Sequence, residues 1–388
     1  MKKITLVLDG VADRPNPKLG SKTPLEYAKT PNLDALYEKS RGGTVLTIPE
    51  GLEVGSAVAN LSLLGFDPHT YRGRSIIEAA GLGIPMNEDD MYIRCNLVDF
   101  EGDSFETSRI KSYSAYDIAT EVAEPVVKRL AEEVFDEEYK LVYCGSFRCT
   151  LIVKGGKKLY PLDLMPAHDI IGQDIAPFIR REGKQAKFFE LMERAYDFLK
   201  KQGVAANGMW MWGDSIMPEI KGDTRGRVAL SETLLMDGIT AIAGLPNIGT
   251  KREGRSFDDF LEEKLEKAIK AVREYDDIYV HIQETDDLSH ELQPVEKMEA
   301  VESIDRVFLG RFLEHIGDDF TLSVASDHFT FSDTGAHGGE PVPYLFYDSK
   351  NERSETGRFT EQDCREKNDT VTAKELKDMQ KTAENNRK

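Results

Sequence analysis

Short apolar runs that end in acidic residues recur along the chain. Residues 4–8 form one such run, which leads into Asp9-Gly10, and residues 320–325 form another, followed closely by Asp327. A continuous apolar run of this length is typical of a strand that is buried on both faces of a sheet. Open α/β sheets place their chemistry at the carboxyl ends of such strands. The pattern therefore predicts buried strands that deliver carboxylates to a crevice at the sheet edge.

Segments with helical periodicity alternate with these runs. The clearest are predicted helices over 57–64, 257–273 and 295–316, and a further predicted strand over 277–282. Alternation of strands and helices predicts a mostly parallel sheet that is sandwiched by helices. We therefore assign the chain to the α/β class.

The pattern changes in the middle of the chain. Predicted strands over 91–99, 141–146 and 149–154 and an amphipathic helix over 115–134 replace the regular alternation. We interpret this region as an inserted domain. The predicted organisation is a core domain of residues 1–86 and 213–388, with a smaller inserted α+β cap domain of residues 87–212.

The amino-acid composition excludes some classes of binding partner. The 388 residues include 69 acidic and 50 basic side chains, which give a formal net charge of −19. Nucleic acids and anionic membranes would be repelled at long range. No apolar run approaches the roughly 20 residues of a membrane helix, and the N-terminus enters a strand pattern instead of a signal peptide. We expect a cytoplasmic protein in which a small anionic substrate would need a local cationic site; assembly into a homo-oligomer stays open.

Metal-type ligands follow three predicted strands. These are Asp9, Asp286 with His290, and Asp327 with His328, while His337 follows in a glycine-bracketed loop. Each residue alone has an ordinary explanation as a helix cap or a structural histidine. Together they favour a metal site, because five of the seven histidines lie between residues 281 and 337. Mixed carboxylate and imidazole ligands suit Mn²⁺ or Zn²⁺ better than Mg²⁺.

Ser56 is the candidate nucleophile. The turn Val54-Gly55-Ser56 opens a predicted helix, where backbone amides converge on an anion. An ordinary N-cap serine is the alternative interpretation. Metal coordination would lower the pKa of the hydroxyl without a neighbouring base. Two metal ions beside Ser56 would suit phosphatase, mutase or kinase chemistry alike.

The order of these motifs resembles the alkaline phosphatase superfamily and, more narrowly, the archaeal-type cofactor-independent phosphoglycerate mutases. The resemblance spans nearly the whole chain. It also covers Lys22-Thr23-Pro24-Leu25, Thr30-Pro31-Asn32-Leu33-Asp34, Leu64-Gly65-Phe66-Asp67-Pro68, Gly73-Arg74, Glu78-Ala79-Ala80, Arg94-Cys95-Asn96-Leu97, His168-Asp169-Ile170 and Pro341-Val342-Pro343.

The resemblance implies that Ser56 takes the phosphoryl group from 3-phosphoglycerate and returns it to the neighbouring oxygen, giving 2-phosphoglycerate. It implies two divalent ions, with Mn²⁺ expected and Zn²⁺, Mg²⁺ and Co²⁺ as alternatives. By analogy one ion would take Asp9, Ser56, Asp327 and His328, and the other Asp286, His290 and His337. The implied substrate-binding residues are Arg94, Arg148, His168 and Asp169; planar guanidinium groups suit phosphate and carboxylate.

Some positions depart from the family pattern. Asp117 and Asp237 stand where the family usually has histidine-containing and lysine-containing motifs, and acids there should weaken phosphoglycerate binding. Residues 207–213 are similar to a bacterial subgroup proposed to be homoserine kinases, so a kinase or phosphotransferase acting on an amino-acid alcohol is the second hypothesis. The third is a binding or regulatory protein with a relict metal site, which would function without Ser56.

Overall fold

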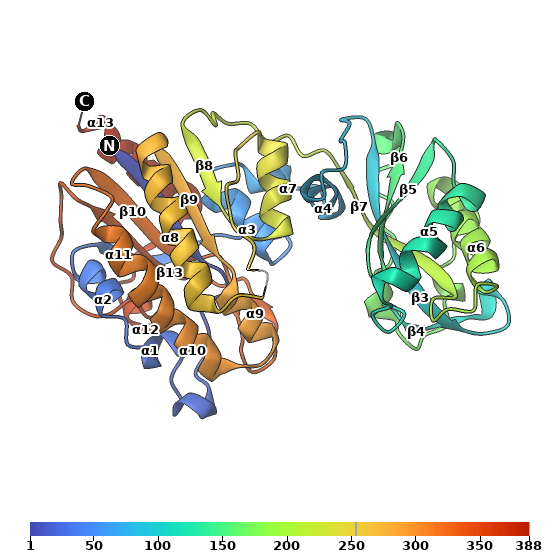
Figure 1. The fold of residues 1–388 in the computed structure, drawn as a ribbon, viewed down its shortest axis with the longest axis horizontal. Coiled ribbons are helices and arrows are strands. Elements are labelled where there is room, and N and C mark those ends of the chain that lie inside the picture. The colour runs from blue at the N-terminus through green and yellow to red at the C-terminus, as the bar shows by residue number, and fades with distance from the viewer. Residues whose placement is uncertain (253, 388) are drawn as a thin grey trace. The chain divides into compact units, whose positions relative to one another are not determined.

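The computed structural model describes residues 1–252 and 254–387, and the chain divides into two compact units (Figure 1). The first unit comprises Met1–Tyr71 and Ile220–Lys388, and the second comprises Arg72–Glu219. The second unit is therefore larger than the predicted insert of residues 87–212. The reason is that helix α4 (Ser75–Gly81) packs on strands β3 and β7 of the second unit, where the Ser75 hydroxyl donates to the Gly213 carbonyl.

The first unit holds most of the regular structure. Its strands are β1 (Lys2–Leu8), β2 (Arg41–Leu46), β8 (Arg227–Leu230), β9 (Asp277–Ile282), β10 (Phe320–Ser326), β11 (Phe329–Thr330), β12 (His337–Gly338), β13 (Val342–Asp348) and β14 (Thr370–Thr372). Its α-helices are α1 (Pro24–Tyr27), α2 (Pro31–Glu38), α3 (Ser56–Leu63), α7 (Leu234–Ala243), α8 (Phe257–Glu274), α9 (Glu284–His290), α10 (Pro294–Ser303), α11 (Gly310–Leu313), α12 (Glu361–Glu366) and α13 (Ala373–Asn385). A π-helical segment, η8 (Ile304–Leu309), lies between α10 and α11, and η1 (Pro17–Leu19) and η2 (Pro68–Thr70) are short 3-10 helices.

Seven strands of this unit form one sheet in the order β14-β2-β13-β10-β1-β9-β8. Strands β10, β1, β9 and β8 run parallel to one another, and β14 runs parallel to β2. Only β13 is antiparallel to both of its neighbours in this sheet. The mostly parallel α/β architecture predicted from the sequence is confirmed.

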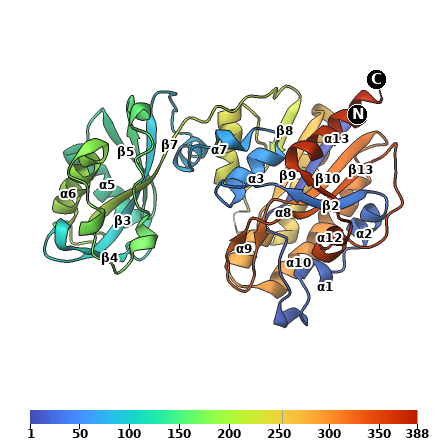
Figure 2. The ribbon, with the colours of Figure 1, turned by 180° about the vertical axis from the view of Figure 1, so that it is seen from behind.

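Helices cover both faces of the sheet. Ile4, Leu6 and Leu8 of β1 point to one face, where they join a buried cluster with residues of α8, η8, α2 and α12. On the other face, Gln380 of α13 donates to the carbonyl oxygen of Ile4 and α3 packs beside α13. Figure 1 shows α8 and α11 in front of the sheet, and Figure 2 shows α3 and α13 from behind. The central strands are thus buried on both sides, as their unbroken apolar runs require.

The predicted helix over 295–316 is interrupted. The chain instead forms α10, the π-helical η8 and α11 in succession. Within η8, the carboxylate of Asp305 accepts a 2.7 Å hydrogen bond from the backbone N–H of Leu33, and Asn32 donates to the same carboxylate. Asp305 therefore caps the first turn of α2. A π-helical turn changes the direction of side chains locally, which periodicity alone does not reveal.

The second unit is an antiparallel sheet covered by helices. Its strands are β3 (Met91–Glu101), β4 (Arg109–Ser112), β5 (Tyr139–Gly145), β6 (Arg148–Val153) and β7 (Gly208–Ile216), and its other α-helices are α5 (Thr120–Val134) and α6 (Ala186–Leu199). Its 3-10 helices are η3 (Phe105–Thr107), η4 (Gly156–Leu159), η5 (Ala167–Ile170), η6 (Ala176–Phe178) and η7 (Gly183–Gln185). Strand β3 pairs with β4, β6 and β7, and β6 pairs with β5.

The helix predicted over 115–134 begins later than expected. Ala115, Tyr116 and Asp117 have φ values of 46°, 59° and 54°, which lie in the left-handed region and exclude an α-helix. The apolar side chains of Ala115 and Ile118 are nevertheless buried. Their spacing therefore matches that of a helix, although the backbone there is not helical.

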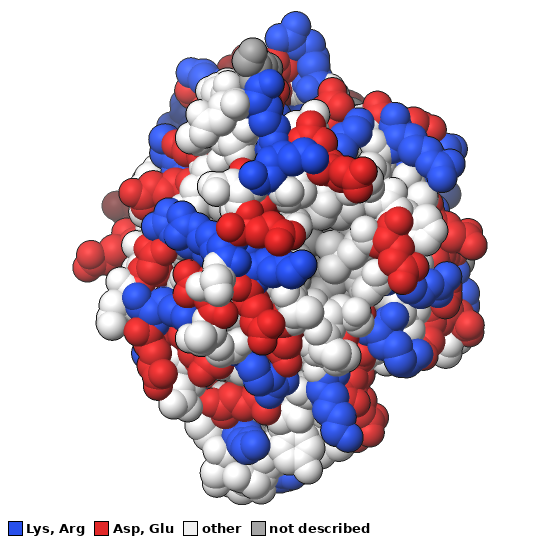
Figure 3. Space-filling model, turned by 90° about the vertical axis from the view of Figure 1, so that its left-hand side faces the viewer, with Lys and Arg blue, Asp and Glu red and all other residues white. Residues whose placement is uncertain are grey.

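The surface mixes charges of both signs. On the face drawn in Figure 3, acidic and basic side chains are interspersed. Among the described residues, no helix has the length and apolar character needed to cross a membrane.

Candidate metal centre and active site

Parallel pairing brings three strand ends to one edge of the sheet. Leu8 at the end of β1 lies in register with Ser326 at the end of β10 and with Ile282 at the end of β9. Asp9 and Asp327 therefore leave neighbouring strands at the same level. Helix α9 begins two residues after β9 and carries Asp286 and His290.

One group of ligand-type atoms consists of Asp9, Asp327 and His328. Their ligand atoms all lie within 4.8 Å of one another, and the three side chains are buried. Nε2 of His328 lies 3.6 Å from Oδ1 of Asp9 and 3.4 Å from Oδ2 of Asp327. Oγ of Ser56 lies 3.0 Å from the same nitrogen. The four side chains assigned by analogy to one ion are thus adjacent.

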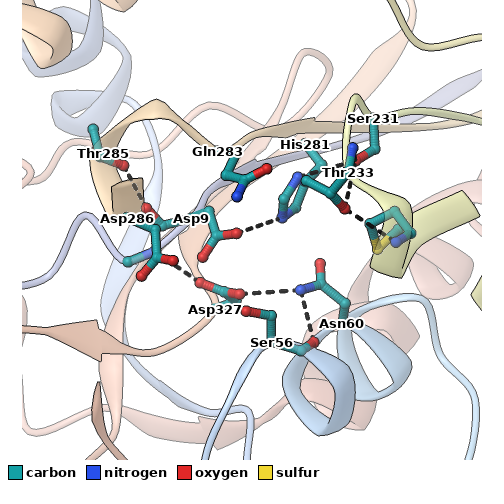
Figure 4. Close-up of polar contacts among 12 residues, drawn as sticks. Asp9, Ser56, Asn60, Ser231, Thr233, His281, Gln283, Thr285, Asp286 and Asp327 are labelled. Atoms are coloured by element: carbon teal, nitrogen blue, oxygen red, sulfur yellow. Dashed lines mark hydrogen bonds and ion pairs between the residues drawn. The ribbon is translucent and has the colours of Figure 1, made fainter. Parts of the chain in front are cut away.

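The second group consists of Asp286, His290 and His337, again with ligand atoms within 4.8 Å of one another. Nε2 of His290 lies 3.3 Å from Oδ2 of Asp286, and Nε2 of His337 lies 3.5 Å from Oδ1. The ring centroids of His328 and His337 are 4.2 Å apart, so the two groups are neighbours. Figure 4 shows the carboxylates of Asp9, Asp286 and Asp327 converging beside Ser56. This arrangement could hold two ions close together.

Ser56 is the first residue of α3, and Gly55 occupies the N-cap position. The Ser56 hydroxyl does not cap the helix, because its contact is with His328. Gly55 has a φ of 155°, and a Cβ atom at that position would lie 3.7 Å from Nδ1 of His337. The contact would be an ordinary one, so glycine is favoured here by the φ angle, which residues with a side chain rarely adopt. The alternative of an ordinary N-cap serine does not describe this site.

The electrostatics of the site favour a bound cation. Burial, followed by the neighbouring Asp327 and Asp286, raises the pKa of Asp9 well above its usual value. Within the described residues, Oδ1 of Asp9 is buried and has no hydrogen-bond donor. Burial also opposes ionisation of Asp286, but hydrogen bonds from His290 and His337 outweigh it and lower the pKa of that carboxyl. Three carboxylates this close need positive charge, which a divalent ion supplies.

Further buried residues, His281, Asn60 and Thr330, contact the metal-type ligands and were given no role from the sequence. Nε2 of His281, on β9, lies 3.1 Å from Oδ2 of Asp9, and its Nδ1 lies 3.2 Å from Oγ of Ser231. Burial lowers the pKa of His281. Asn60, on α3, donates a 3.0 Å hydrogen bond from Nδ2 to Oδ2 of Asp327. The spacing of four between Ser56 and Asn60 was a usable signal, since it places both on one helix face.

The predicted substrate-binding residues lie in the second unit. Arg94 of β3 donates from Nε to Oε2 of Glu78 at 2.9 Å and from Nη2 to the other oxygen of that carboxylate. The Arg94 guanidinium also lies 4.7 Å from the centroid of the Trp212 ring. The Nε and Nη2 edge of its guanidinium is therefore occupied by a carboxylate of the protein itself.

Arg148, His168 and Asp169 are more accessible. Arg148 begins β6, is exposed, and lies 4.5 Å over the ring of Phe147. His168 and Asp169 lie in η5, each about half exposed, with Nε2 of His168 3.7 Å from Oδ1 of Asp169. The His168 ring packs edge-on against Trp212 at 5.1 Å. Arg94 and His168 thus both contact the ring of Trp212.

The two acids that depart from the family pattern have different surroundings. Asp237 lies in the first turn of α7, and its Oδ1 accepts a 2.7 Å hydrogen bond from Nδ2 of Asn247. It therefore stabilises the loop after α7. Asp117 lies in the exposed left-handed turn before α5, where its backbone N–H donates to Oγ of Ser114.

Known proteins resemble this chain over most of its length. The family described as 2,3-bisphosphoglycerate-independent phosphoglycerate mutase matches residues 38–205. The 2,3-bisphosphoglycerate-independent phosphoglycerate mutase of Methanosarcina mazei is 34% identical over 367 residues, which cover 89% of this chain and 90% of the relative.

Two solved structures share the fold. A protein of Pyrococcus horikoshii aligns with a TM-score of 0.79 at 24% identity, covering 99% of this chain and 97% of the other. The cofactor-independent phosphoglycerate mutase of Thermoplasma acidophilum aligns with a TM-score of 0.67 at 22% identity, covering 98% and 99%.

Proposed function

Because this chain belongs to the 2,3-bisphosphoglycerate-independent phosphoglycerate mutase family, we propose that it interconverts 3-phosphoglycerate and 2-phosphoglycerate through a phosphorylated Ser56 and two divalent metal ions. This is a phosphoryl-transfer step of glycolysis and gluconeogenesis, and it needs no nucleotide.

The observation that carries the proposal is the position of the Ser56 hydroxyl. Its Oγ lies 3.0 Å from Nε2 of His328, within the first ligand group and beside the second. The residue also starts α3, whose first backbone N–H groups have no partner within the helix. A phosphoryl group on Oγ would meet these donors, because helix N-termini attract anions.

The side chains suit a pair of divalent ions. One ion would be held by Asp9, Ser56, Asp327 and His328, and the other by Asp286, His290 and His337. The unpartnered Oδ1 of Asp9 fits this assignment, as does the mixture of carboxylate and imidazole that Mn²⁺ accepts. When bound, such ions supply the positive charge that lowers the pKa of a serine hydroxyl and neutralises phosphoryl oxygens.

The reaction consists of two transfers of opposite direction. In the first, the bond between phosphorus and the oxygen at position 3 breaks while a bond from phosphorus to Oγ of Ser56 forms. The hydroxyl loses a proton and the released glycerate oxygen gains one. In the second, the oxygen at position 2 takes the phosphoryl group and Ser56 recovers its proton, so atoms and charge balance over the cycle.

Among the cations of the second unit, Arg148 is the better candidate for holding substrate. Its guanidinium is exposed and rests on an aromatic ring, whereas Nε and Nη2 of Arg94 already donate to Glu78. A planar guanidinium can bind a carboxylate or phosphate through two hydrogen bonds. We propose that Arg94 instead holds the ring of Trp212 in place.

Phosphoryl transfer to an amino-acid alcohol remains the competing candidate, because Asp117 is an exposed acid that could attract an ammonium group. Asp237 offers less support for it, since its carboxylate is already engaged by Asn247.

The decisive experiment follows phosphorus NMR signals of 3-phosphoglycerate incubated with the Mn²⁺-loaded protein. We expect 2-phosphoglycerate to form, and Ser56→Ala to slow its formation by at least about 1,000-fold. Ser62→Ala is the matched control, because this hydroxyl lies on the same helix and donates only to the Val58 carbonyl.

A parallel tube with ATP and homoserine tests the competing candidate. Phosphohomoserine in that tube, without exchange in the first, would replace the mutase proposal by a kinase. Full activity of Ser56→Ala would remove the phosphoserine step.

A further inference from the structure

Asn60 connects the candidate nucleophile to a metal-type ligand. It lies on α3 one turn after Ser56, and its side chain is completely buried. Nδ2 donates to the carbonyl oxygen of Ser56 at 2.9 Å and to Oδ2 of Asp327 at 3.0 Å. Oδ1 accepts a 2.6 Å hydrogen bond from the hydroxyl of Tyr279. Both amide protons and the amide oxygen are therefore used.

The orientation of the Asn60 amide follows from the chemistry of its three partners. The Tyr279 side chain is buried on β9, and the partner of its hydroxyl is Oδ1 of Asn60. An inverted amide would set its oxygen against the carboxylate of Asp327, and neither group could donate. The carboxylate of Asp327 and the carbonyl of Ser56, which can only accept, thus select the orientation in which Nδ2 faces them, and the Tyr279 hydroxyl donates to the amide oxygen on the other side.

The remaining contacts of Asp327 explain why Oδ2 matters. Oδ1 accepts hydrogen bonds of 2.9 Å from the backbone N–H groups of Gly10 and His328. Oδ2 is left as the oxygen that faces the ligand group, 3.4 Å from Nε2 of His328. The hydrogen bond from Asn60 uses one lone pair of Oδ2 and fixes the plane of the carboxylate. Outer hydrogen bonds of this kind orient metal ligands and tune metal affinity.

We propose that Asn60, held by a hydrogen bond from Tyr279, is a positioning residue for the metal ion of the Asp9, Asp327 and His328 group. It holds Oδ2 of Asp327 and the first turn of α3 in one arrangement, so that the carboxylate and Oγ of Ser56 face the same point (Figure 4). The inference deepens the proposed function and rests on it only for its kinetic consequence.

The test measures Mn²⁺ binding by isothermal titration calorimetry, which needs no substrate. The background carries His290→Ala, so that the second ligand group is disabled and the signal comes from the first. There we expect Asn60→Leu, which keeps a side chain of similar size, to raise the dissociation constant about 10- to 100-fold. Ser62→Ala on the same helix should leave it unchanged.

Tyr279→Phe provides a second variant that keeps the buried volume. It removes only the hydroxyl that donates to Oδ1 of Asn60 and leaves both hydrogen bonds of Nδ2 in place, so we expect a smaller rise in the dissociation constant, of a few-fold. If Asn60→Leu does not fold, this variant decides the question. Unchanged Mn²⁺ affinity in the folded variants would overturn the proposal, as would an equal loss of affinity at both groups when His290 is intact.

Kinetics separate this proposal from the proposed function. With an intact mutase reaction, Asn60→Leu should lower kcat at least tenfold at saturating Mn²⁺ and change KM for phosphoglycerate less than about twofold, because the asparagine is fully buried and its amide is engaged by Ser56, Asp327 and Tyr279. A wild-type protein that binds Mn²⁺ but does not turn over phosphoglycerate would refute the function and leave the metal test of Asn60 valid. A wild-type protein that binds no Mn²⁺ would refute both.

Discussion

Oγ of Ser56 lies 3.0 Å from Nε2 of His328, although the two residues are 272 positions apart in the chain. The strand that ends before Asp327 and the helix that begins at Ser56 meet at this point. The hydroxyl and the imidazole face the same small volume as the carboxylates of Asp9 and Asp327. Closely placed carboxylates repel one another unless a cation lies between them.

Metal binding should therefore stabilise the fold. At a free Mn²⁺ concentration 100 times the dissociation constant, we expect the free energy of unfolding to rise by about 2.7 kcal/mol for each occupied site. Urea unfolding with Mn²⁺ and with a chelator measures the difference. The double variant His290→Ala with His328→Ala should lose this response, and a response that persists in it would place the metal elsewhere.

Arg148 and Arg94 should behave differently when truncated. Arg148→Ala is expected to raise KM for phosphoglycerate about tenfold or more without changing the thermal midpoint, because an exposed guanidinium contributes mainly to binding. Arg94→Ala should lower the thermal midpoint, because it leaves the half-buried Glu78 without its bidentate partner. Steady-state kinetics and thermal unfolding of both variants test the contrast. The opposite pattern would show that Arg94 is the substrate contact.

Lys297 supports strand β11, which pairs with the strand β12 that contains His337. Its fully buried ammonium lies 3.0 Å from Oδ2 of Asp13 and donates to the carbonyl oxygen of Thr330 at 2.9 Å. We expect Lys297→Met to cost about 3–5 kcal/mol in unfolding free energy, because Asp13 would keep a buried charge without its partner. Lys374→Met is the control, since that lysine is solvent-exposed, and it should leave the unfolding curve unchanged. Equal effects of the two would contradict the argument.

Glu361 should make stability depend on pH. Burial raises the pKa of its carboxyl to about 7, although Thr23 and the backbone of Asp13 donate to it. An acid whose pKa is raised in the folded state stabilises it below the unfolded pKa, and this contribution is lost as the pH rises through 7.

Glu361→Gln cannot ionise, so its stability relative to wild type should rise between pH 5 and pH 8, by roughly 2–3 kcal/mol. Urea unfolding at both pH values measures this difference. The exposed Glu366→Gln on the same helix is the control. A Glu361→Gln difference that does not change with pH would refute the buried titration.

The parts of the fold that were predictable rest on local pattern. Buried parallel strands are apolar throughout, so the apolar runs of β1 and β10 could be recognised as strands in the sequence. The acidic residues at the ends of these runs could then be predicted to lie at the sheet edge. The antiparallel direction of β13 was not visible, because its apolar run has the same composition whichever way it pairs. Direction is set by partners that are distant in sequence.

The site shows the same limit. Asp9, Asp286 and Asp327 could be proposed because strand ends converge, but the pairing of Arg94 with Glu78 joins a strand to a helix 16 residues earlier. The sequence around a charged residue does not show whether its side chain contacts a substrate or forms an ion pair within the protein. His281 was equally hidden, since its role depends on which face of β9 packs beside Asp9.

The order of strands in the large sheet also bears on how the protein is made. Strand β1 contains residues near the N-terminus, yet its neighbours are β9 and β10, which are synthesised more than 270 residues later. The second unit, by contrast, is one continuous segment with its own buried core. Pairing between distant segments is slow to form, and domains generally fold as units during synthesis. We expect the inserted unit to fold on the ribosome before the strands that pair with β1 have been synthesised.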